Sequence, residues 1–150
     1  MTKYDVTDET FLNFEPHKVF KALMDQSDGF MSWWRPHVVA NKIEGPAFGQ
    51  PGGKIHCKVN CFGWPQFTME AVEIQEDRLI KAKYIDGSFV GVGTWTLKPE
   101  NGGTRLSFRW QMDPNELMFK LSAPFISAPK LHSSVMKKGF EALSRYLETR

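Results

Sequence analysis

Hydrophobic and polar residues alternate with a period of two through most of residues 37–112, a pattern typical of β-strands. Turns that contain glycine or proline divide this region into short segments. The pattern predicts six strands, at residues 37–44, 53–61, 66–75, 78–86, 89–98 and 103–112. Because the connections between them are short, we expect consecutive strands to pair as an antiparallel meander.

The last of these segments alternates most clearly. Leu106, Phe108, Trp110 and Met112 share one face, and Arg109 falls on the opposite face. This predicts a sheet with one face toward the core and the other toward water. We therefore expect Arg109 to be a solvated residue of the outer face.

Two segments depart from this regularity. The hydrophobic phase changes near Ala71, which predicts a β-bulge there. In the segment 89–98, Gly91 and Gly93 occupy the phase that carries Phe89 and Trp95. Glycine inside a strand is typical of a bend or a close approach, so the sheet is expected to be curled.

The remaining chain shows helical patterns. Residues 6–14 predict a first strand, and a helix opened by Pro16 and a short turn at 29–34 follow it. Asp113 to Glu116 has the form of a helix N-terminal cap, which predicts a short helix over 114–122. Residues 129–150 carry one apolar stripe with helical spacing, so this closing helix is expected to bury one face against the sheet.

Composition limits the class of protein. A chain of 150 residues, 41% hydrophobic and 24% charged, fits one globular domain over residues 1–150. A net charge of +2, spread along the chain, offers no concentrated basic surface for nucleic acid. Neither a targeting segment nor an apolar run of membrane-spanning length is visible, so we expect a cytoplasmic protein without stable membrane insertion.

The two cysteines, Cys57 and Cys61, lie four positions apart in a predicted strand. A disulfide between them would need a sharp turn. A metal site that adds His56 lacks a fourth ligand at a recognisable spacing. Free thiols are therefore expected, and no metal or cofactor is predicted.

Nucleotide-binding and hydrolase motifs are absent from the sequence, which contains no GxGxxG, P-loop, GxSxG or HExxH pattern. Among the histidines, His56 falls in the outward phase of its strand. His37 lies near the predicted rim of the sheet, and His132 lies in the first turn of the closing helix. Each of these two is more typical of a solvated or capping residue.

Tyr84 shares its phase with Ile80 and Ala82, which makes it the best candidate for an inward-facing hydroxyl. That hydroxyl is suited to orient a ligand, although a core tyrosine with a satisfied hydroxyl has the same pattern. Glu70 and Glu73 lie on opposite faces of one strand unless the bulge brings them together, so they do not form a carboxylate pair.

The order of these elements, together with several local stretches, resembles the START-like helix-grip superfamily called SRPBCC, in its polyketide cyclase/dehydrase-like branch. These stretches are Phe14-Glu15-Pro16 with Val19-Phe20 and Asp25, Trp33-Trp34 before Pro36, Gly91-x-Gly93-Thr94-Trp95-Thr96-Leu97, Gly103-Thr104-Arg105-Leu106, and Gly139-Phe140-x3-Leu143-x2-Tyr146-Leu147. The resemblance implies an α+β helix-grip (START/Bet v-like) fold. In that fold, a curved antiparallel sheet of about seven strands wraps a long C-terminal helix, with two short helices after the first strand. Members bind lipids, sterols, hormones or aromatic polyketides, and some cyclise or dehydrate their ligand; no catalytic residue carries over to this chain.

Three hypotheses for function follow. The leading hypothesis is a protein that binds a small hydrophobic ligand, lipid-like or aromatic, between sheet and closing helix. The second is a cofactor-free polyketide cyclase or dehydratase in the same cavity, and the third is an interaction module with a filled cavity and an exposed Trp33-Trp34 edge. The predicted cavity wall consists of Trp64, Phe67, Tyr84, Trp95, Phe108, Trp110, Met118, Phe125, Met136 and Phe140.

Overall fold

The protein was analysed as a computed structural model that describes residues 2–27, 29–61, 64–115 and 128–150. The elements follow one another in the predicted order. They are β1 (Tyr4–Leu12), α1 (Pro16–Met24), the 3-10 turn η1 (Ser32–Trp34), β2 (Val38–Lys42), β3 (Lys54–Val59), β4 (Gln66–Gln75), β5 (Leu79–Gly87), β6 (Phe89–Glu100), β7 (Gly103–Pro114) and α3 (Ala128–Glu148).

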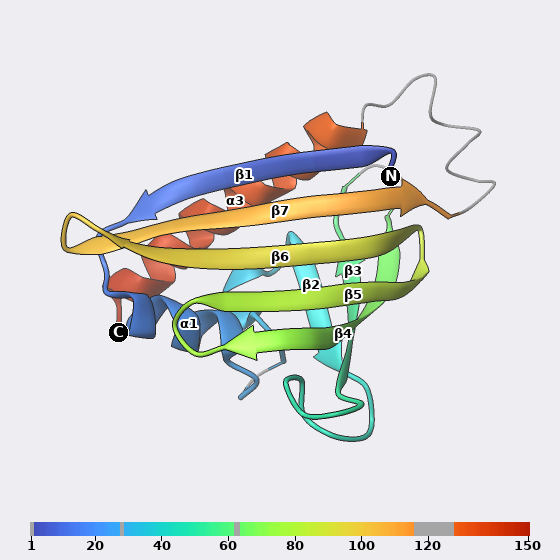
Figure 1. Cartoon of the computed structure of the whole chain (residues 1–150), viewed down its shortest axis with the longest axis horizontal. Helices are drawn as coiled ribbons and strands as arrows, with labels where there is room; N and C mark the ends of the chain where they lie inside the picture. Colours follow the sequence, from blue (N-terminus) through green and yellow to red (C-terminus); the bar gives the residue numbers. More distant parts are fainter. Residues whose placement is uncertain (1, 28, 62–63, 116–127) are drawn as a thin grey trace.

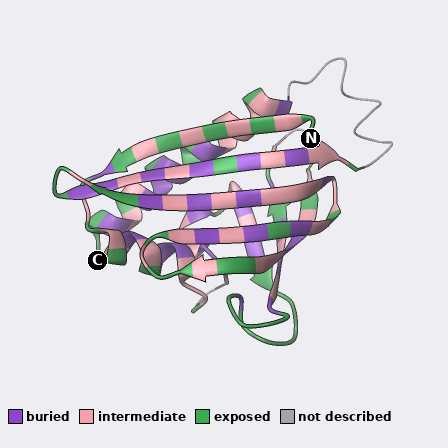
Figure 2. Ribbon diagram, viewed as in Figure 1, coloured by how far each residue is buried: buried purple, intermediate pink, exposed green. Residues whose placement is uncertain are grey.

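The seven strands form one antiparallel sheet in the order β1-β7-β6-β5-β4-β3-β2. Strands β2 to β7 are therefore the predicted meander, and β1 is added beside β7 with Tyr4 opposite Met112 and Leu12 opposite Thr104. The sheet curls strongly, and β2 and β3 turn across the ends of the longer strands (Figure 1). Buried and more exposed positions alternate along the strands, as the sequence pattern predicts (Figure 2).

Helix α3 runs along the concave side of the sheet, and α1 lies near its C-terminal end (Figure 1). Its buried face is the predicted apolar stripe, which includes Met136, Phe140, Leu143 and Leu147. At about 1.5–3 kcal/mol for each large side chain, burial of this stripe is a major stabilising contribution. The Tyr146 hydroxyl also donates a hydrogen bond of 3.1 Å to Asp25 at the end of α1.

Helix α3 approaches the remaining chain very closely at Gly139. A Cβ atom on this residue would lie only 2.4 Å from the Trp34 indole. Trp34 is itself held by Trp33, whose ring stacks on it at 5.5 Å, and by Trp95 at 6.2 Å. Trp33 in turn donates a hydrogen bond of 2.9 Å to the Ala22 carbonyl of α1. The two tryptophans therefore join both helices to the sheet, and Trp34 is only 7% exposed.

The irregular strands behave as predicted. The pairing of β4 with β5 shifts register between Ala71 and Glu73, which confirms the bulge. The close approach predicted from the glycines of β6 is present at Gly93, where a Cβ would lie 2.6 Å from the Phe108 ring. The absence of a side chain at Gly93 allows that ring to lie flat over the inner face of the sheet.

One local prediction needs correction. Asp113 and Pro114 belong to β7, opposite Val90 and Phe89, so no helix begins at Pro114. Asp113 instead accepts a 2.7 Å hydrogen bond from the backbone N–H of Lys3, because the strand continues to pair beyond the predicted end. The second short helix, predicted at 29–34, is present as the 3-10 turn η1. The remainder of the helix predicted over 114–122 lies outside the described residues.

None of the described helices is long and apolar enough to cross a lipid bilayer.

The Gly139–Trp34 contact leads to a first prediction. Helix propensity alone would make Gly139→Ala more stable by about 1 kcal/mol. The new methyl group would overlap the fixed indole, so we expect the free energy of unfolding to fall by about 1–3 kcal/mol. Urea denaturation measures this change. The neighbouring exposed substitution Lys138→Ala serves as control, and a stabilised Gly139→Ala protein would show that Trp34 does not limit the approach of α3.

Candidate functional site: an apolar cavity under the closing helix

A cavity of about 380 Å³ lies between the concave face of the sheet and α3. The N-terminal half of the helix borders it, through Ala128, Leu131, His132, Val135 and Met136. From Gly139 onward the buried helix residues belong to the packed core instead. The cavity therefore lies beside the N-terminal half of α3.

Most of the predicted wall borders this cavity. The predicted residues found there are Phe67, Tyr84, Trp95, Phe108, Trp110 and Met136. Phe140 is buried behind the wall, with its ring 6.5 Å from that of Trp95. Trp64 is 55% exposed, outside the cavity wall, with the Lys58 ammonium 5.3 Å from its ring. Met118 and Phe125 lie outside the described residues.

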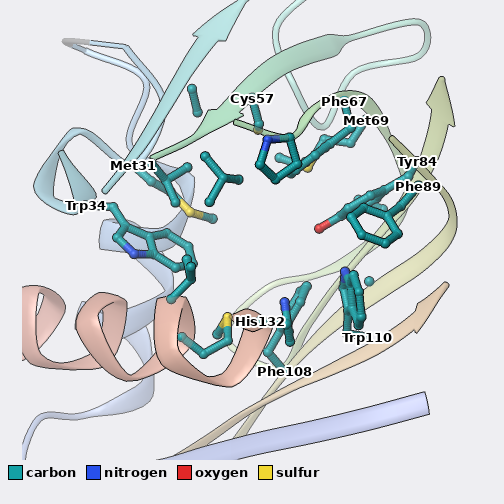
Figure 3. Close-up of a pocket in the computed structure, with 18 of the residues that line it drawn as sticks. Met31, Trp34, Cys57, Phe67, Met69, Tyr84, Phe89, Phe108, Trp110 and His132 are labelled. Atoms are coloured by element: carbon teal, nitrogen blue, oxygen red, sulfur yellow. The ribbon is translucent and has the colours of Figure 1, made fainter. Parts of the chain in front are cut away.

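The aromatic wall residues are arranged in contacting pairs. Phe67 and Tyr84 stack with ring centroids 4.3 Å apart and an interplanar angle of 11°. The Trp95 and Phe108 rings are 4.7 Å apart. These contacts hold the rings at the edge of the cavity, facing the space between sheet and helix (Figure 3).

Three further residues border the cavity although the sequence did not indicate them as wall. Phe30 and Met31 precede η1, and Phe48 lies in the connection between β2 and β3. The Phe30 and Phe48 rings are 5.0 Å apart. The Gln26 side chain makes hydrogen bonds of 3.2 Å to both the N–H and the carbonyl of Phe48. The sequence signal that could have indicated this wall residue was Phe48 itself, an aromatic residue inside the glycine- and proline-rich stretch 45–53.

Other wall residues follow from the alternation itself. Phe89 shares the inward phase of β6 with Trp95, and its ring is 4.9 Å from that of Trp110. Cys57 is the inward residue of β3 next to Ile55. Both positions were assigned the correct phase from the sequence but were not included in the wall.

Tyr84 carries one of the few polar groups of the cavity. Its side chain is buried, and its hydroxyl oxygen points into the open space (Figure 3). Burial raises the pKa of this hydroxyl above its usual range, with a smaller contribution from Cys57, so the group is neutral at physiological pH. No hydrogen bond to the Tyr84 hydroxyl is formed within the described part of the chain. The predicted inward hydroxyl is confirmed.

His132 is the second polar group, and its position corrects the expectation of a solvated or capping residue. Its side chain is 13% exposed and stacks on Trp110 at 4.3 Å, with the rings 10° from parallel. The helix turns this residue inward because His132, Val135, Met136 and Gly139 lie on the same stripe. The Nε2 atom is fully covered and has no hydrogen-bond partner among the described residues.

The charged group that faces His132 is Asp8 of the edge strand β1. Its Oδ2 atom lies 3.8 Å from Nε2, is also covered and also lacks a described hydrogen-bond partner. Burial lowers the pKa of His132 to about 3, so the imidazole is neutral at physiological pH. The two side chains are therefore a close polar contact between helix and strand, with no charge on the histidine.

The two cysteines form no disulfide within the described residues, and both border the cavity. Burial raises the pKa of Cys57 to about 12. Cys61 is half-buried, and burial also raises its pKa, although nearby Lys138 opposes the change. Neither thiol is activated as a nucleophile, because the thiolate is the reactive form.

Several other candidates point away from the cavity, as expected. His56 makes a 3.1 Å hydrogen bond to Gln66 on the outer side of the sheet. Arg109 holds Asp5 through two hydrogen bonds of 2.9 and 2.8 Å on the outer face. Glu70 and Glu73 are opposite Lys83 and Lys81 of β5, outside the cavity wall.

His37 also lies outside the cavity wall. Potential metal ligands gather elsewhere, at His17, Glu76 and Asp77 on the surface, whose ligand atoms lie within 4.8 Å of one another. His17 and Asp77 already contact each other at 2.9 Å. Exposed groups of this kind are common without a bound ion, and none of the three borders the cavity.

Curled sheet, enclosed helix and intervening cavity together define a helix-grip protein. Residues 3–148 match the family described as "Polyketide cyclase / dehydrase and lipid transport". The chain belongs to this family, and thereby to the SRPBCC superfamily that the sequence resembles. No curated protein matches its sequence significantly.

Solved structures share the fold across nearly the whole chain. Protein TTHA0849 from Thermus thermophilus has a TM-score of 0.76 and 16% sequence identity, covering 97% of this chain and 98% of its own. Protein CV1439 from Chromobacterium violaceum has a TM-score of 0.69 and 20% identity, covering 96% of each chain. Ara h 8.0201 has a TM-score of 0.69 and 16% identity, covering 98% and 99%. At these identities the similarity establishes the fold alone.

Burial of neutral His132 predicts a specific pH dependence. The unfolded chain has a histidine pKa near 6.5, and the folded value is about 3. The stability that neutral His132 contributes is therefore complete above pH 6.5 and is lost as the pH falls toward 3. Relative to His132→Phe, the wild-type protein should lose about 1.4 kcal/mol of unfolding free energy per pH unit in that range.

Denaturant unfolding of both proteins between pH 7.5 and 4 measures this difference. The aromatic ring of the variant preserves the stack on Trp110, and Asp8 is present in both proteins. Parallel stability curves for the two proteins would contradict the assigned burial of a neutral imidazole.

Proposed function

We propose that this protein binds a small, uncharged hydrophobic ligand in the cavity between the sheet and α3. The observation that carries the proposal is the cavity itself, about 380 Å³ of space bordered mainly by aromatic and aliphatic side chains. Small-molecule sites are usually of this kind, with a few polar groups placed in an apolar wall. Family membership supports the same function, because the family description includes lipid transport.

Energetics favour occupancy of this space. Interiors normally pack without voids larger than a water molecule, and an empty apolar cavity costs free energy in proportion to its size. A void of about 380 Å³ corresponds to a cost on the order of several kcal/mol. Water would fill it poorly, because each buried water needs two to four polar partners. A hydrophobic ligand recovers the lost contacts.

Ring shape matters as well as size. The stacked pair Phe67–Tyr84 and the pair Trp95–Phe108 present flat faces and edges to the cavity. Aromatic rings pair favourably in offset or edge-to-face arrangements, so a flat ligand gains contacts beyond simple burial. The cavity is therefore better suited to a compact ring compound than to a long flexible chain.

A cyclase or dehydratase activity in the same cavity is the second candidate. It is favoured by the two inward polar groups, since Tyr84 supplies a neutral donor and His132 a nitrogen base. An imidazole whose pKa is lowered to about 3 is a weak base at neutral pH. Binding without chemistry is therefore the better-supported function.

The third hypothesis, an interaction module, required a filled cavity and an exposed Trp33-Trp34 edge. Trp34 is only 7% exposed, and its indole contacts Gly139 and Trp95. That edge is part of the core that joins α1, α3 and the sheet. The expectation of an exposed edge at Trp34 is therefore wrong.

Filling the cavity provides a test. Ala82 lies on the cavity floor, so Ala82→Phe should exclude ligand and reduce affinity for a hydrophobic probe at least tenfold. The probe is the uncharged compound N-phenyl-1-naphthylamine, followed by fluorescence titration. Native mass spectrometry of the purified wild-type protein, compared with the variant, tests in parallel for a co-purifying small molecule.

The matched control is Val72→Phe, which adds an aromatic ring at a position of β4 that is 56% exposed. It should bind N-phenyl-1-naphthylamine like the wild-type protein. Equal affinity of all three proteins would show that the probe does not enter the cavity, and that result would overturn the proposal.

A further inference from the structure

We propose that His132, positioned by Asp8, makes one end of the cavity a hydrogen-bond acceptor that selects an uncharged ligand carrying a hydroxyl group. This inference rests on the proposed function and adds the chemical class of the ligand. It is carried by two covered polar atoms that lie 3.8 Å apart behind the cavity wall and have no hydrogen-bond partner among the described residues.

The imidazole stands between the cavity and the edge of the sheet. On one side, its Nε2 atom is covered and lies 3.8 Å from Asp8 Oδ2 of β1. On the other side, a ring nitrogen of His132 is directed into the open space (Figure 3). Stacking against Trp110 at 4.3 Å fixes the plane of the ring, so its two nitrogens face two different environments.

The position of Asp8 decides which nitrogen is the acceptor. A neutral imidazole carries one N–H, and the other nitrogen is an acceptor. The carboxylate oxygen of Asp8 favours the tautomer with the proton on Nε2, because that places the positive end of the N–H dipole toward it. The lone pair of Nδ1 then faces the cavity. A ligand hydroxyl is a donor of the kind that this nitrogen requires.

Charge in the cavity argues against ionic ligands. No lysine, arginine, aspartate or glutamate among the described residues borders the cavity. Burying a carboxylate without a positive partner is costly, and the same holds for an ammonium without a negative one. The carboxylate of Asp8 lies behind the imidazole and would repel an anion further. The selected ligand is therefore uncharged at physiological pH.

Three probes that share one ring system test whether the wild-type protein selects an uncharged ligand with a hydroxyl group. They are naphthalene, 2-naphthol and 2-naphthoate, titrated at pH 7 by quenching of tryptophan fluorescence. We expect 2-naphthol to bind about tenfold more tightly than naphthalene, the effect of one buried hydrogen bond. We expect 2-naphthoate to bind more weakly than naphthalene.

Variants of His132 test whether this residue causes the preference for 2-naphthol over naphthalene. In His132→Phe, which keeps the stack on Trp110, the affinities for 2-naphthol and naphthalene should become equal within about twofold. In His132→Asn, an amide oxygen can replace Nδ1 as acceptor, so a preference for 2-naphthol should persist. Tyr84→Phe removes the other inward hydroxyl and tests whether that group contributes to the preference. His56→Phe, the same substitution on the outer side of the sheet, is the matched control and should leave the preference unchanged.

The outcomes separate the two proposals. If none of the three probes binds, the proposed function fails. If naphthalene binds as tightly as 2-naphthol to the wild-type protein, only the selection of a hydroxyl is overturned. Tight binding of 2-naphthoate would overturn the exclusion of charge, and loss of the preference in Tyr84→Phe but not in His132→Phe would overturn the acceptor role of His132. The wild-type titrations decide the question even if a variant does not fold.

Discussion

The contact between Trp34 and Gly139 sets the distance between helix and sheet on which the rest of the structure depends. A helix packs against another element at a separation determined by the side chains between them. At Gly139 that side chain is absent, and the Trp34 indole fills the gap. The C-terminal half of α3 is thereby held close to the core, where Leu143 and Leu147 are almost fully buried.

Toward the N-terminal end of α3 the same geometry produces the cavity. The sheet curls around the helix (Figure 1), and the cavity lies beside the part of α3 that ends at Met136. Trp110 reaches α3 by stacking on His132, while the other aromatic side chains that border the space support one another in pairs. An aromatic ring has only two side-chain torsions, and a stacked ring has little freedom to collapse inward. The void is therefore maintained by packing within its wall.

The periodic parts of the fold could be predicted from the sequence because each strand and the closing helix carry a period that one burial face explains. Tyr84 was placed inward on this basis, and Arg109 outward. Positions outside regular elements could not be placed in this way. Phe48 borders the cavity from a loop that is held by hydrogen bonds to Gln26. Trp64 follows the end of β3 with no alternation to orient it. His132 was a different case. Its position continues the apolar stripe of the closing helix, which indicates an inward side chain. It was nevertheless predicted to be solvated, because a histidine near a helix end usually is.

His132 and Asp8 also show why the cavity is more than a packing defect. Leaving a buried polar atom without a partner costs about 1–3 kcal/mol, and a leucine at position 132 would avoid that cost. The surrounding structure provides no described partner for Nε2, yet it stacks the imidazole on Trp110 and covers the facing carboxylate oxygen. Such an arrangement is destabilising for an empty fold. A ligand hydroxyl bonded to Nδ1 would leave Nε2 as it is, but binding would add a polar contact at the end of the cavity to the apolar contacts of the wall, and these gains would offset the cost.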